Sequence, residues 1–527
     1  MTPDFTPALD VVTLSRLQFG LTAMYHFLFV PLTLGLAILL VVMESVYVMT
    51  GRVIWRQMTQ FWGTLFGINF ALGVATGITM EFQFGMNWAY YSHYVGDIFG
   101  APLAIEGLMA FFLEASFIGL FFFGWDRLPK VGHLVVTCLV AFGSNLSALW
   151  ILIANAWMQH PVGARFNPDT MRMEVTNFKA VLFNPVAQDK FVHTVSAGYV
   201  TGSIFVAAIS AFYLLRGRHL EIAKRSLAVA ASFGLASALS VVVLGDESGY
   251  TAGANQKMKI AAIEAMWETE HAPASFTLFG IPNVTTHHTD YAVRVPWVLG
   301  LIATRSLSGE VPGIIPLVND AKARIESGLD AYKGLLHIRK DRDDPSARAA
   351  ITAHSGDLGY ALLLKAQRPD IENATEDQIE KAAWTTVPAV LPLFWSFRVM
   401  VGLGFFFIGL FAITFYFVSV RKIEKIRPLL WVLLLALPLP WIAAELGWFV
   451  SEVGRQPWVI EGVLPTFLAV SSLTAANVVI TLIGFVLFYS TLLVVDVYLM
   501  VKTVRIGPGP LPPLAAAPVA ILPVAAE

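Results

Sequence analysis

Long apolar stretches separated by short polar loops occupy most of the chain. Nine of them are long enough to cross a hydrocarbon core of about 30 Å as helices. They cover approximately residues 17–48, 58–80, 100–123, 131–158, 191–215, 227–244, 391–420, 428–450 and 467–500. The pattern predicts an all-α polytopic membrane protein with about nine transmembrane helices.

A charged segment interrupts this pattern between the sixth and seventh stretches. Residues 245–387 hold 33 of the 72 charged residues, whereas the other 384 residues hold 39. So polar a segment is costly inside a bilayer and predicts a large insert in water. We therefore expect membrane helices one to six in 1–244, the insert in 245–387, helices seven to nine in 388–506, and a disordered Pro- and Ala-rich tail in 507–527.

Composition supports a membrane protein and excludes several classes of site. Hydrophobic residues make up 56% of the 527 residues and charged residues 14%, against about 25% charged in soluble domains. The net charge of -2 gives no reason to expect nucleic acid. A single cysteine, Cys138, excludes a disulfide framework, a thiolate zinc site, an iron–sulfur cluster and covalent C-x-x-C-H haem attachment within this chain.

Cations in the short loops predict the orientation, because cytoplasmic loops retain Lys and Arg. They follow the odd-numbered stretches: Arg52, Arg56, Arg127, Lys130, Arg216, Arg218, Lys224, Arg225, Arg421, Lys422, Lys425, Arg427, Lys502 and Arg505. The N-terminus and the insert should then be external and the C-terminus cytoplasmic. The loop between stretches four and five departs from this pattern, since it carries four cations beside three acids. The first stretch does not resemble a cleaved signal peptide, because no cation precedes Arg16.

Ionisable groups inside the membrane are costly and are therefore functional candidates. Two histidines, His26 and His193, lie within apolar stretches, and seven carboxylates lie in or beside them: Glu44, Glu81, Glu106, Glu114, Glu445, Glu452 and Asp496. With the predicted orientation, His26, Glu106, His193, Met400 and Glu452 all fall in the outer half of the bilayer.

Paired acids in two stretches predict a route for protons. Glu114 should lie about 12 Å further inward than Glu106 and about 80° around the helix. Glu445 and Glu452, seven residues apart, should share one helix face. A path of this kind would lead from the inner side to the outer group of candidates.

Imidazole, thioether and carboxylate at one depth suit haem iron, and His with Met is a common low-spin pair. Arg398, inside a stretch, needs a buried anion such as a haem propionate, and Arg455 could meet a propionate or lipid phosphate at the interface. The same residues allow other interpretations. A lone intramembrane His can be a helix contact, and intramembrane glutamates suit a proton-coupled transporter. Lys259 and Glu264 could serve an amphipathic substrate, but in so charged a segment we expect them to be solvated.

Seven motifs resemble one family over most of the chain, from Leu14 to about Gly507. They are SRLQF at 15–19, MYHF at 24–27, GINFALGVATG at 67–77, IEG at 105–107, KFVHT at 190–194, FRVM at 397–400 and GRQPW at 454–458. In this order they resemble subunit I of the cytochrome bd quinol oxidases, in the branch with a long quinol loop. A haem-copper oxidase would need a cluster of intramembrane histidines, and only two are available.

The resemblance implies three haems and their ligands. His193 and Met400 match the axial ligands of a low-spin haem b. His26, Glu106 and Glu452 match residues of the high-spin pair, a haem b and haem d; His26 matches the haem d ligand, although the opposite assignment to the high-spin haem b stays open.

The resemblance also implies roles for the other candidates. Glu114 and Ser147 match a proton path, Trp448 an aromatic residue between haems, and Arg398 a residue that supports the low-spin haem. Lys259 and Glu264 match residues that act in quinol oxidation.

The activity implied is that of a terminal oxidase in the bacterial cytoplasmic membrane. It oxidises quinol at the outer face and reduces dioxygen with cytoplasmic protons, without pumping. A second large membrane subunit and a small single-span subunit are the implied partners. The residues do not choose between ubiquinol and menaquinol.

Overall fold

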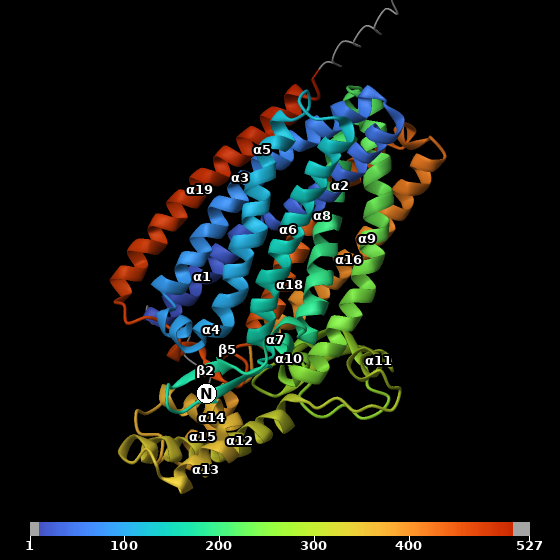
Figure 1. Cartoon of the computed structure of the whole chain (residues 1–527). Helices are drawn as coiled ribbons and strands as arrows, with labels where there is room; N and C mark the ends of the chain where they lie inside the picture. The colour runs from blue at the N-terminus through green and yellow to red at the C-terminus, as the bar shows by residue number, and fades with distance from the viewer. Residues whose placement is uncertain (1–9, 510–527) are drawn as a thin grey trace, which may run out of the picture.

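The computed structural model of the chain describes residues 10–509, and within them nine helical segments are long and apolar enough to cross a membrane (Figure 1). They are Val11–Thr50, Val53–Met86, Ala89–Phe123, Lys130–Gln159, Phe178–Arg216, Leu220–Asn255, Val390–Ser419, Arg427–Val453 and Ala475–Ile506. The all-α class and the number of spans are confirmed. Residues 510–527 of the expected tail lie outside the described residues.

The membrane helices come in two runs on either side of the insert. The first holds α1 (Val11–Phe27), α2 (Val30–Thr50), α3 (Val53–Met86), α4 (Ala89–Ile105), the π-helix η1 (Glu106–Phe111), α5 (Phe112–Phe123), α6 (Lys130–Gln159), α7 (Phe178–Leu182), α8 (Pro185–Arg216) and α9 (Leu220–Asn255). The second holds α16 (Val390–Ser419), η4 (Ile423–Lys425), α17 (Arg427–Leu435), α18 (Leu439–Val453), η5 (Thr466–Leu468) and α19 (Ala475–Ile506).

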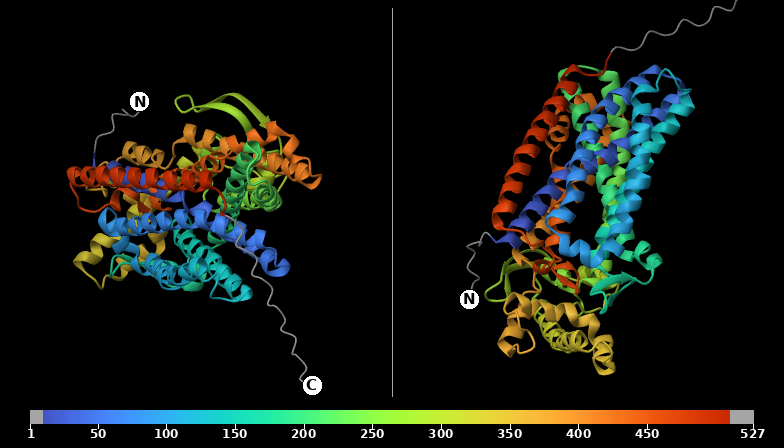
Figure 2. Two further views of the ribbon diagram at one scale, coloured as in Figure 1. Left: turned by 90° about the horizontal axis from the view of Figure 1, so that it is seen from above. Right: turned by 60° about the vertical axis from the view of Figure 1, so that its left-hand side comes forward.

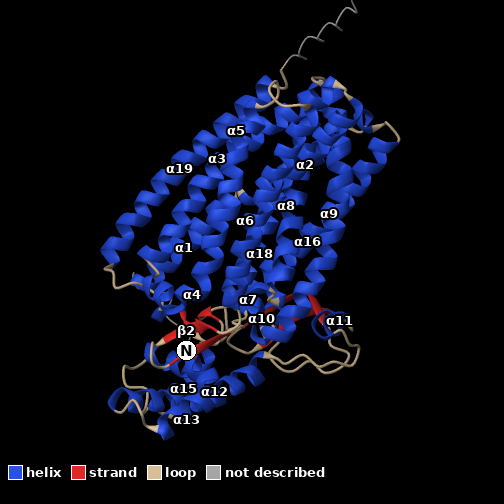
Figure 3. Ribbon diagram, viewed as in Figure 1, coloured by secondary structure: helices blue, strands red, loops and turns tan. Residues whose placement is uncertain are grey.

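The insert and two short hairpins lie together at one end of the bundle (Figure 3). The insert contains α10 (Lys257–Ile263), β3 (Phe276–Asn283), β4 (His288–Val295), α11 (Val298–Thr304), α12 (Ile314–Lys340), α13 (Pro345–His354), η2 (Ser355–Asp357), α14 (Leu358–Leu362), η3 (Leu363–Ala366) and α15 (Glu376–Trp384). The hairpins are β1 (Ala164–Asn167) with β2 (Arg172–Val175), and β5 (Trp458–Ile460) with β6 (Leu464–Pro465). Helix α9 continues to Asn255, eleven residues beyond the boundary expected at residue 244.

Two of the predicted spans are broken rather than continuous. The first consists of α1 and α2, and Pro31 lies in the first turn of α2. The eighth consists of α17 and α18, and the break between them holds Pro438, with Pro440 in the first turn of α18. Proline lacks the N–H that a continuous helix needs, which accounts for helices that start at these positions. As a result, His26 lies in the last turn of α1, beside a break.

Glycines allow α2 and α8 to cross in backbone contact. A β-carbon built at Gly35 would lie 2.3 Å from the carbonyl oxygen of Gly198 and 2.8 Å from the Cα atom of Gly202. Small residues permit such close approach between membrane helices. By contrast, α19 contacts α1 and α3 and lies at the edge of the bundle, as the right-hand view of Figure 2 shows.

Candidate functional site

His26 lies directly against α3. Its Nδ1 atom lies 2.9 Å from Thr76 Oγ1. A β-carbon built at Gly77, one residue further along α3, would lie 3.1 Å from His26 Cε1. The glycine therefore leaves the edge of the imidazole uncovered by any side chain at that position.

His193 and Met400 also face glycines on neighbouring helices. A β-carbon at Gly245 of α9 would lie 3.2 Å from His193 Cε1, and one at Gly447 of α18 would lie 3.1 Å from Met400 Sδ. Among the described residues, the buried Nδ1 atom of His193 has no hydrogen-bond partner. These four residues lie on α8, α9, α16 and α18. Helix α8 contacts α9, α9 contacts α16, and α16 contacts α18.

This repeated arrangement fits haem. Each of the three strongest candidate ligands has an imidazole or a thioether placed against a glycine, so no side chain at that position lies against the ligand. An imidazole nitrogen without a partner in an apolar interior also suits coordination, since buried polar atoms are otherwise hydrogen-bonded. The glycines were not among the predicted residues, because a lone glycine in an apolar run gives no indication of what it faces.

Trp448 connects two of these positions. Its ring meets Phe27 edge-on with centroids 5.3 Å apart, and Phe27 follows His26. The preceding residue, Gly447, lies against Met400. Two consecutive residues of α18 therefore contact the surroundings of two candidate ligands.

Glu106 of η1 and Glu114 of α5 both face α6, the helix that carries Ser147. Ser147 Oγ donates to Glu106 Oε1 over 2.7 Å. Glu114 is 6% exposed and packs against Gly143, one turn before Ser147, where a β-carbon would lie 2.7 Å from Glu114 Cγ. The rotation of about 80° expected between the two glutamates assumed an α-helix throughout. That assumption is wrong, because the π-helix η1 spans Glu106–Phe111.

The buried anion that Arg398 needs is Glu264. Arg398 Nη2 lies 3.0 Å from Glu264 Oε2, and Nη1 and Nε donate to the carbonyl oxygens of Ile263 (2.6 Å) and Thr277 (2.8 Å). Burial raises the pKa of Glu264 to about 7, although Arg398 and the N–H of Thr277 favour the charged form. A haem propionate is thus not required to satisfy this guanidinium.

Lys259 and Glu264 were expected to be solvated, but they are buried, with only 6% and 3% of their surface exposed. Lys259 Nζ donates to the side-chain oxygens of Gln159 (2.6 Å) and Gln256 (2.8 Å). Burial lowers the pKa of Lys259. The expectation was wrong because the insert folds onto the bundle end and encloses this segment of α10.

Glu452 lies in a polar cluster at the same end. Its Oε2 atom pairs with Arg455, and its Oε1 atom accepts from Asn155 (3.2 Å) and Gln159 (3.0 Å). Lys190 Nζ lies 3.8 Å away. Both carboxylate oxygens thus already have protein donors, and as an iron ligand Glu452 would exchange one of them.

Comparison with known proteins identifies the family. A family model described as cytochrome bd terminal oxidase subunit I matches residues 14–508. The chain belongs to this family. It is 53% identical, over 95% of its length and 97% of the relative, to cytochrome bd-II ubiquinol oxidase subunit 1 of Escherichia coli (strain K12). It is 35% identical, over 94% of both chains, to cytochrome bd ubiquinol oxidase subunit 1 of Bacillus subtilis (strain 168).

The fold agrees with a solved member of the same family. The bd oxidase of Geobacillus thermodenitrificans matches with a TM-score of 0.74 over 95% of this chain and 99% of that one, at 24% identity. As a bd-oxidase subunit I, the chain is a multi-span membrane subunit of an oxidoreductase, and the family implies haem. The resemblance inferred from the seven motifs is confirmed.

Several polar residues of this bd-oxidase subunit were missed by the sequence analysis. Gln159, Gln256 and Glu461 surround Lys259, and burial raises the pKa of Glu461. At the opposite end, His133 was also missed; its Nδ1 atom lies 2.6 Å from Oε1 of Glu44, a carboxylate that the sequence did indicate, and both side chains are buried. Two signals for this cluster were available in the sequence: Asn155 lies in an apolar stretch, and Glu461 lies beside the GRQPW motif. The sequence did not show which helices pack together.

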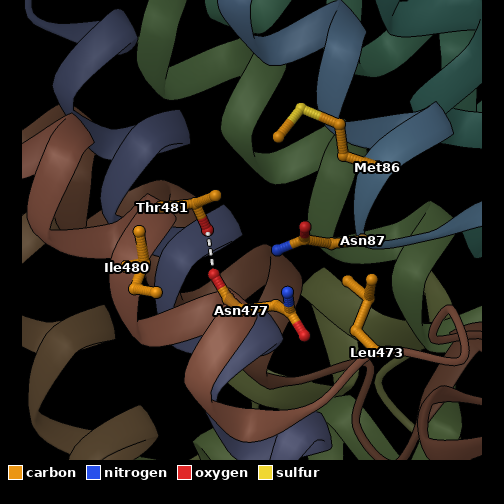
Figure 4. A pocket seen from close by; sticks show the side chains of 6 residues that line it. All are labelled: Met86, Asn87, Leu473, Asn477, Ile480 and Thr481. Carbon is orange, nitrogen blue, oxygen red and sulfur yellow. Dashed lines mark hydrogen bonds between the residues drawn. The ribbon is translucent and has the colours of Figure 1, made fainter.

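A separate cavity of about 320 Å³ lies between the end of α3 and the start of α19 (Figure 4). Its lining holds none of the predicted site residues: Met86, Asn87, Leu473, Asn477, Ile480 and Thr481. The candidate haem and quinol residues are therefore grouped apart from this cavity.

Proposed function

We propose that this chain is the haem-bearing catalytic subunit of a terminal respiratory oxidase that oxidises quinol and reduces dioxygen to water. The observation that carries the proposal is the family match over residues 14–508, joined to a His–Met pair and a further His that each face a glycine. Ubiquinol is the proposed substrate, because the 53% identical relative is named a ubiquinol oxidase.

Three haems are assigned to this chain. His193 and Met400 would hold a low-spin haem b, and His26, Glu452 and Glu106 would serve a high-spin haem b and haem d, with His26 at haem d. When bound, the haems supply electron transfer and the reduction of oxygen. Arg455 pairs with the Glu452 carboxylate, and we assign it to a propionate as well.

Quinol oxidation is assigned to the enclosed end of α10. A buried carboxylate with a pKa near 7 can accept a proton from a quinol hydroxyl at neutral pH, and Glu264 has this property. Arg398 fixes the position of that carboxylate through Oε2. Lys259 of α10, held by two glutamine oxygens, provides a hydrogen-bond donor five residues before Glu264.

Protons for oxygen reduction are assigned to the other side of the molecule. Glu114 would receive them from the cytoplasm beside Gly143 of α6 and pass them towards Ser147, one turn further along α6, and its partner Glu106. Trp448 would lie between the haems. With the insert external, quinol protons leave on one side and oxygen takes protons from the other, so a proton motive force arises without pumping.

The proposed setting is the bacterial cytoplasmic membrane, with the N-terminus and the quinol loop outside and the C-terminus inside. A second large membrane subunit and a small single-span subunit are the proposed partners. Support comes from the family description, which names this chain as one subunit of an oxidase.

The test is a reduced-minus-oxidised visible spectrum of membranes that contain the complex, together with quinol-dependent oxygen uptake. We expect b- and d-type bands, and uptake driven by ubiquinol. A proton-coupled transporter that uses the glutamates alone would give neither. Absence of the bands in membranes that contain folded protein would overturn the proposal.

A further inference from the structure

The hairpin of β3 and β4 has an unusual outer surface. One side, with Thr277, Gly280 and Thr289, is buried on the insert. The other side presents large apolar residues, which we call the hairpin apolar face: Leu278, Phe279, Ile281, Tyr291, Val293 and Val295. An antiparallel sheet with one face in water normally carries polar residues there. Tyr291 is 81% and Val293 53% exposed, so this face has no cover within the described chain.

The hairpin lies beside a membrane span, not beyond it. Phe279 meets Trp395 of α16 edge-on with ring centroids 5.3 Å apart, and the carbonyl of Thr277 accepts from Arg398 over 2.8 Å. These two residues of α16 are five and eight positions past its first residue, Val390, or roughly 8 and 12 Å along the helix. The strand β3 therefore runs next to the outer turns of an apolar helix.

The hairpin apolar face continues the exposed apolar surface of its neighbours. Leu391 and Val399 of α16 are large and exposed, and so are Trp297 and Leu301 at α11, which packs on α9. Seen from above, the hairpin extends outward from the bundle (Figure 2). Tyrosine and tryptophan at such a position are typical of the membrane interface.

The hairpin is held firmly on its other side. Thr289 Oγ1 donates to the carbonyl of Ala265 over 2.9 Å, and the ring of His287 at the hairpin turn stacks between Trp267 and Trp384, 4.9 Å from each. The charged residues of β4 have partners: Arg294 pairs with Glu270, and Asp290 lies near His288. A hairpin with a largely apolar outer face and paired charges is suited to a lipid surface.

We propose that the β3–β4 hairpin is embedded in the membrane leaflet at the insert's end of the bundle and forms the lipid-side wall of the Glu264 site. Thr277, whose N–H donates to Glu264 Oε2 over 3.2 Å, is followed directly by Leu278 on the outer face. One strand therefore separates the carboxylate from the acyl chains. Given the proposed function, a quinol ring would reach Glu264 past the edge of this strand while its isoprenoid tail stays in the lipid.

Quenching of a site-specific fluorophore tests where the hairpin lies. In the holoenzyme with Cys138→Ser, bimane is attached to Val293→Cys or, as the matched control, to Glu372→Cys on the exposed part of the insert. The complex is placed in nanodiscs of phosphatidylethanolamine and phosphatidylglycerol. We expect acyl-brominated lipid to quench the Val293 label several-fold more than the control label, and iodide to do the reverse. The proposal would be overturned if iodide quenched the Val293 label as strongly as the control label. It would also be overturned if a covering protein protected the Val293 label from both quenchers.

A charge on the hairpin apolar face tests its role. In Val293→Asp we expect kcat/KM to fall several-fold for a quinol with a long isoprenoid tail but not for a short-tailed quinol, with Thr352→Asp as the control. An equal loss for both quinols, or no loss, would contradict the proposed wall. If the wild type oxidised neither quinol, the proposed function would fail, whereas the quenching result would still decide the place of the hairpin.

Discussion

At the scale of single residues, the candidate ligands share one arrangement: a ring or a sulfur atom lies against a glycine on a neighbouring helix. Gly77, Gly245 and Gly447 serve His26, His193 and Met400 in this way. A larger side chain at these glycines would occupy the space beside the ligand. These glycines, which the sequence did not suggest as site residues, can therefore decide whether a haem fits beside the ligands.

Met400→Leu should convert the low-spin haem b towards high spin and leave the d-type band in place. Leucine keeps the volume but has no sulfur atom to coordinate iron. The reduced-minus-oxidised visible spectrum measures the change. Val399→Leu, at the exposed neighbouring position, should retain the wild-type spectrum. An unchanged low-spin band in Met400→Leu would exclude this residue as a ligand.

Glu264 should give quinol oxidation an acidic limb. Below its pKa of about 7 the carboxyl is protonated and cannot accept a proton, so the rate should rise as pH increases through about 7. Glu264→Gln should lower the rate by about a hundredfold or more and remove this limb. The measurement is quinol-driven oxygen uptake against pH. Glu268→Gln, at an exposed position four residues on, should keep the wild-type profile; an acidic limb that persists in Glu264→Gln would refute the assignment.

The sequence indicated site residues in the apolar stretches, where charged and ionisable residues are rare. His26 and His193 could be selected because they are ionisable groups in apolar stretches. Lys259 and Glu264 could not, since nothing in a charged segment shows which two of its ionic residues become buried. The Arg398–Glu264 pair joins residues 134 positions apart, and such pairing depends on how the insert folds back.

At the scale of elements, departures from regular helix occur at the candidate site. The break after α1 follows His26 within two residues, and the π-helix η1 begins at Glu106. π-Helical turns are rare and frequent at functional sites. Hydropathy predicted the spans but neither of these features, because apolar content does not distinguish an α-turn from a π-turn. Prolines marked the breaks, whereas the sequence around Glu106 gives no comparable signal.

Gly202→Ala should destabilise the contact between α2 and α8. The added β-carbon would lie 2.6 Å from the carbonyl carbon of Gly35, which is backbone and cannot turn away. Overpacking of this kind costs about 1–3 kcal/mol, so the apparent melting temperature should fall by several degrees. Size-exclusion chromatography after heating in detergent measures it. Gly484→Ala, with nothing within 4 Å of the new carbon, should match the wild type, and equal stability of both variants would contradict the close crossing.

At the scale of the whole molecule, the two proposed proton reactions are separated along the bundle. Lys259 of α10 and Glu264, directly after it, lie at the end covered by the insert, whereas Glu114 lies within the bundle on α5 (Figure 1). The count of charges predicted an insert, and the structure places it at one end only. The sidedness of the reaction follows from this separation, provided that the insert is external as the loop cations predict.

The sidedness can be measured in proteoliposomes that hold the complex with its insert outward. During quinol oxidation the external medium should acidify by as many protons as electrons transferred, because protons are released outside and taken up inside. Glu114→Gln should slow oxygen reduction by tenfold or more, as removal of a proton-transfer group does, while quinol binding is retained. Glu424→Gln, at an exposed position in η4, should behave as the wild type. Wild-type turnover in Glu114→Gln would remove this residue from the path, and a release exceeding the electrons transferred would show that the enzyme also pumps.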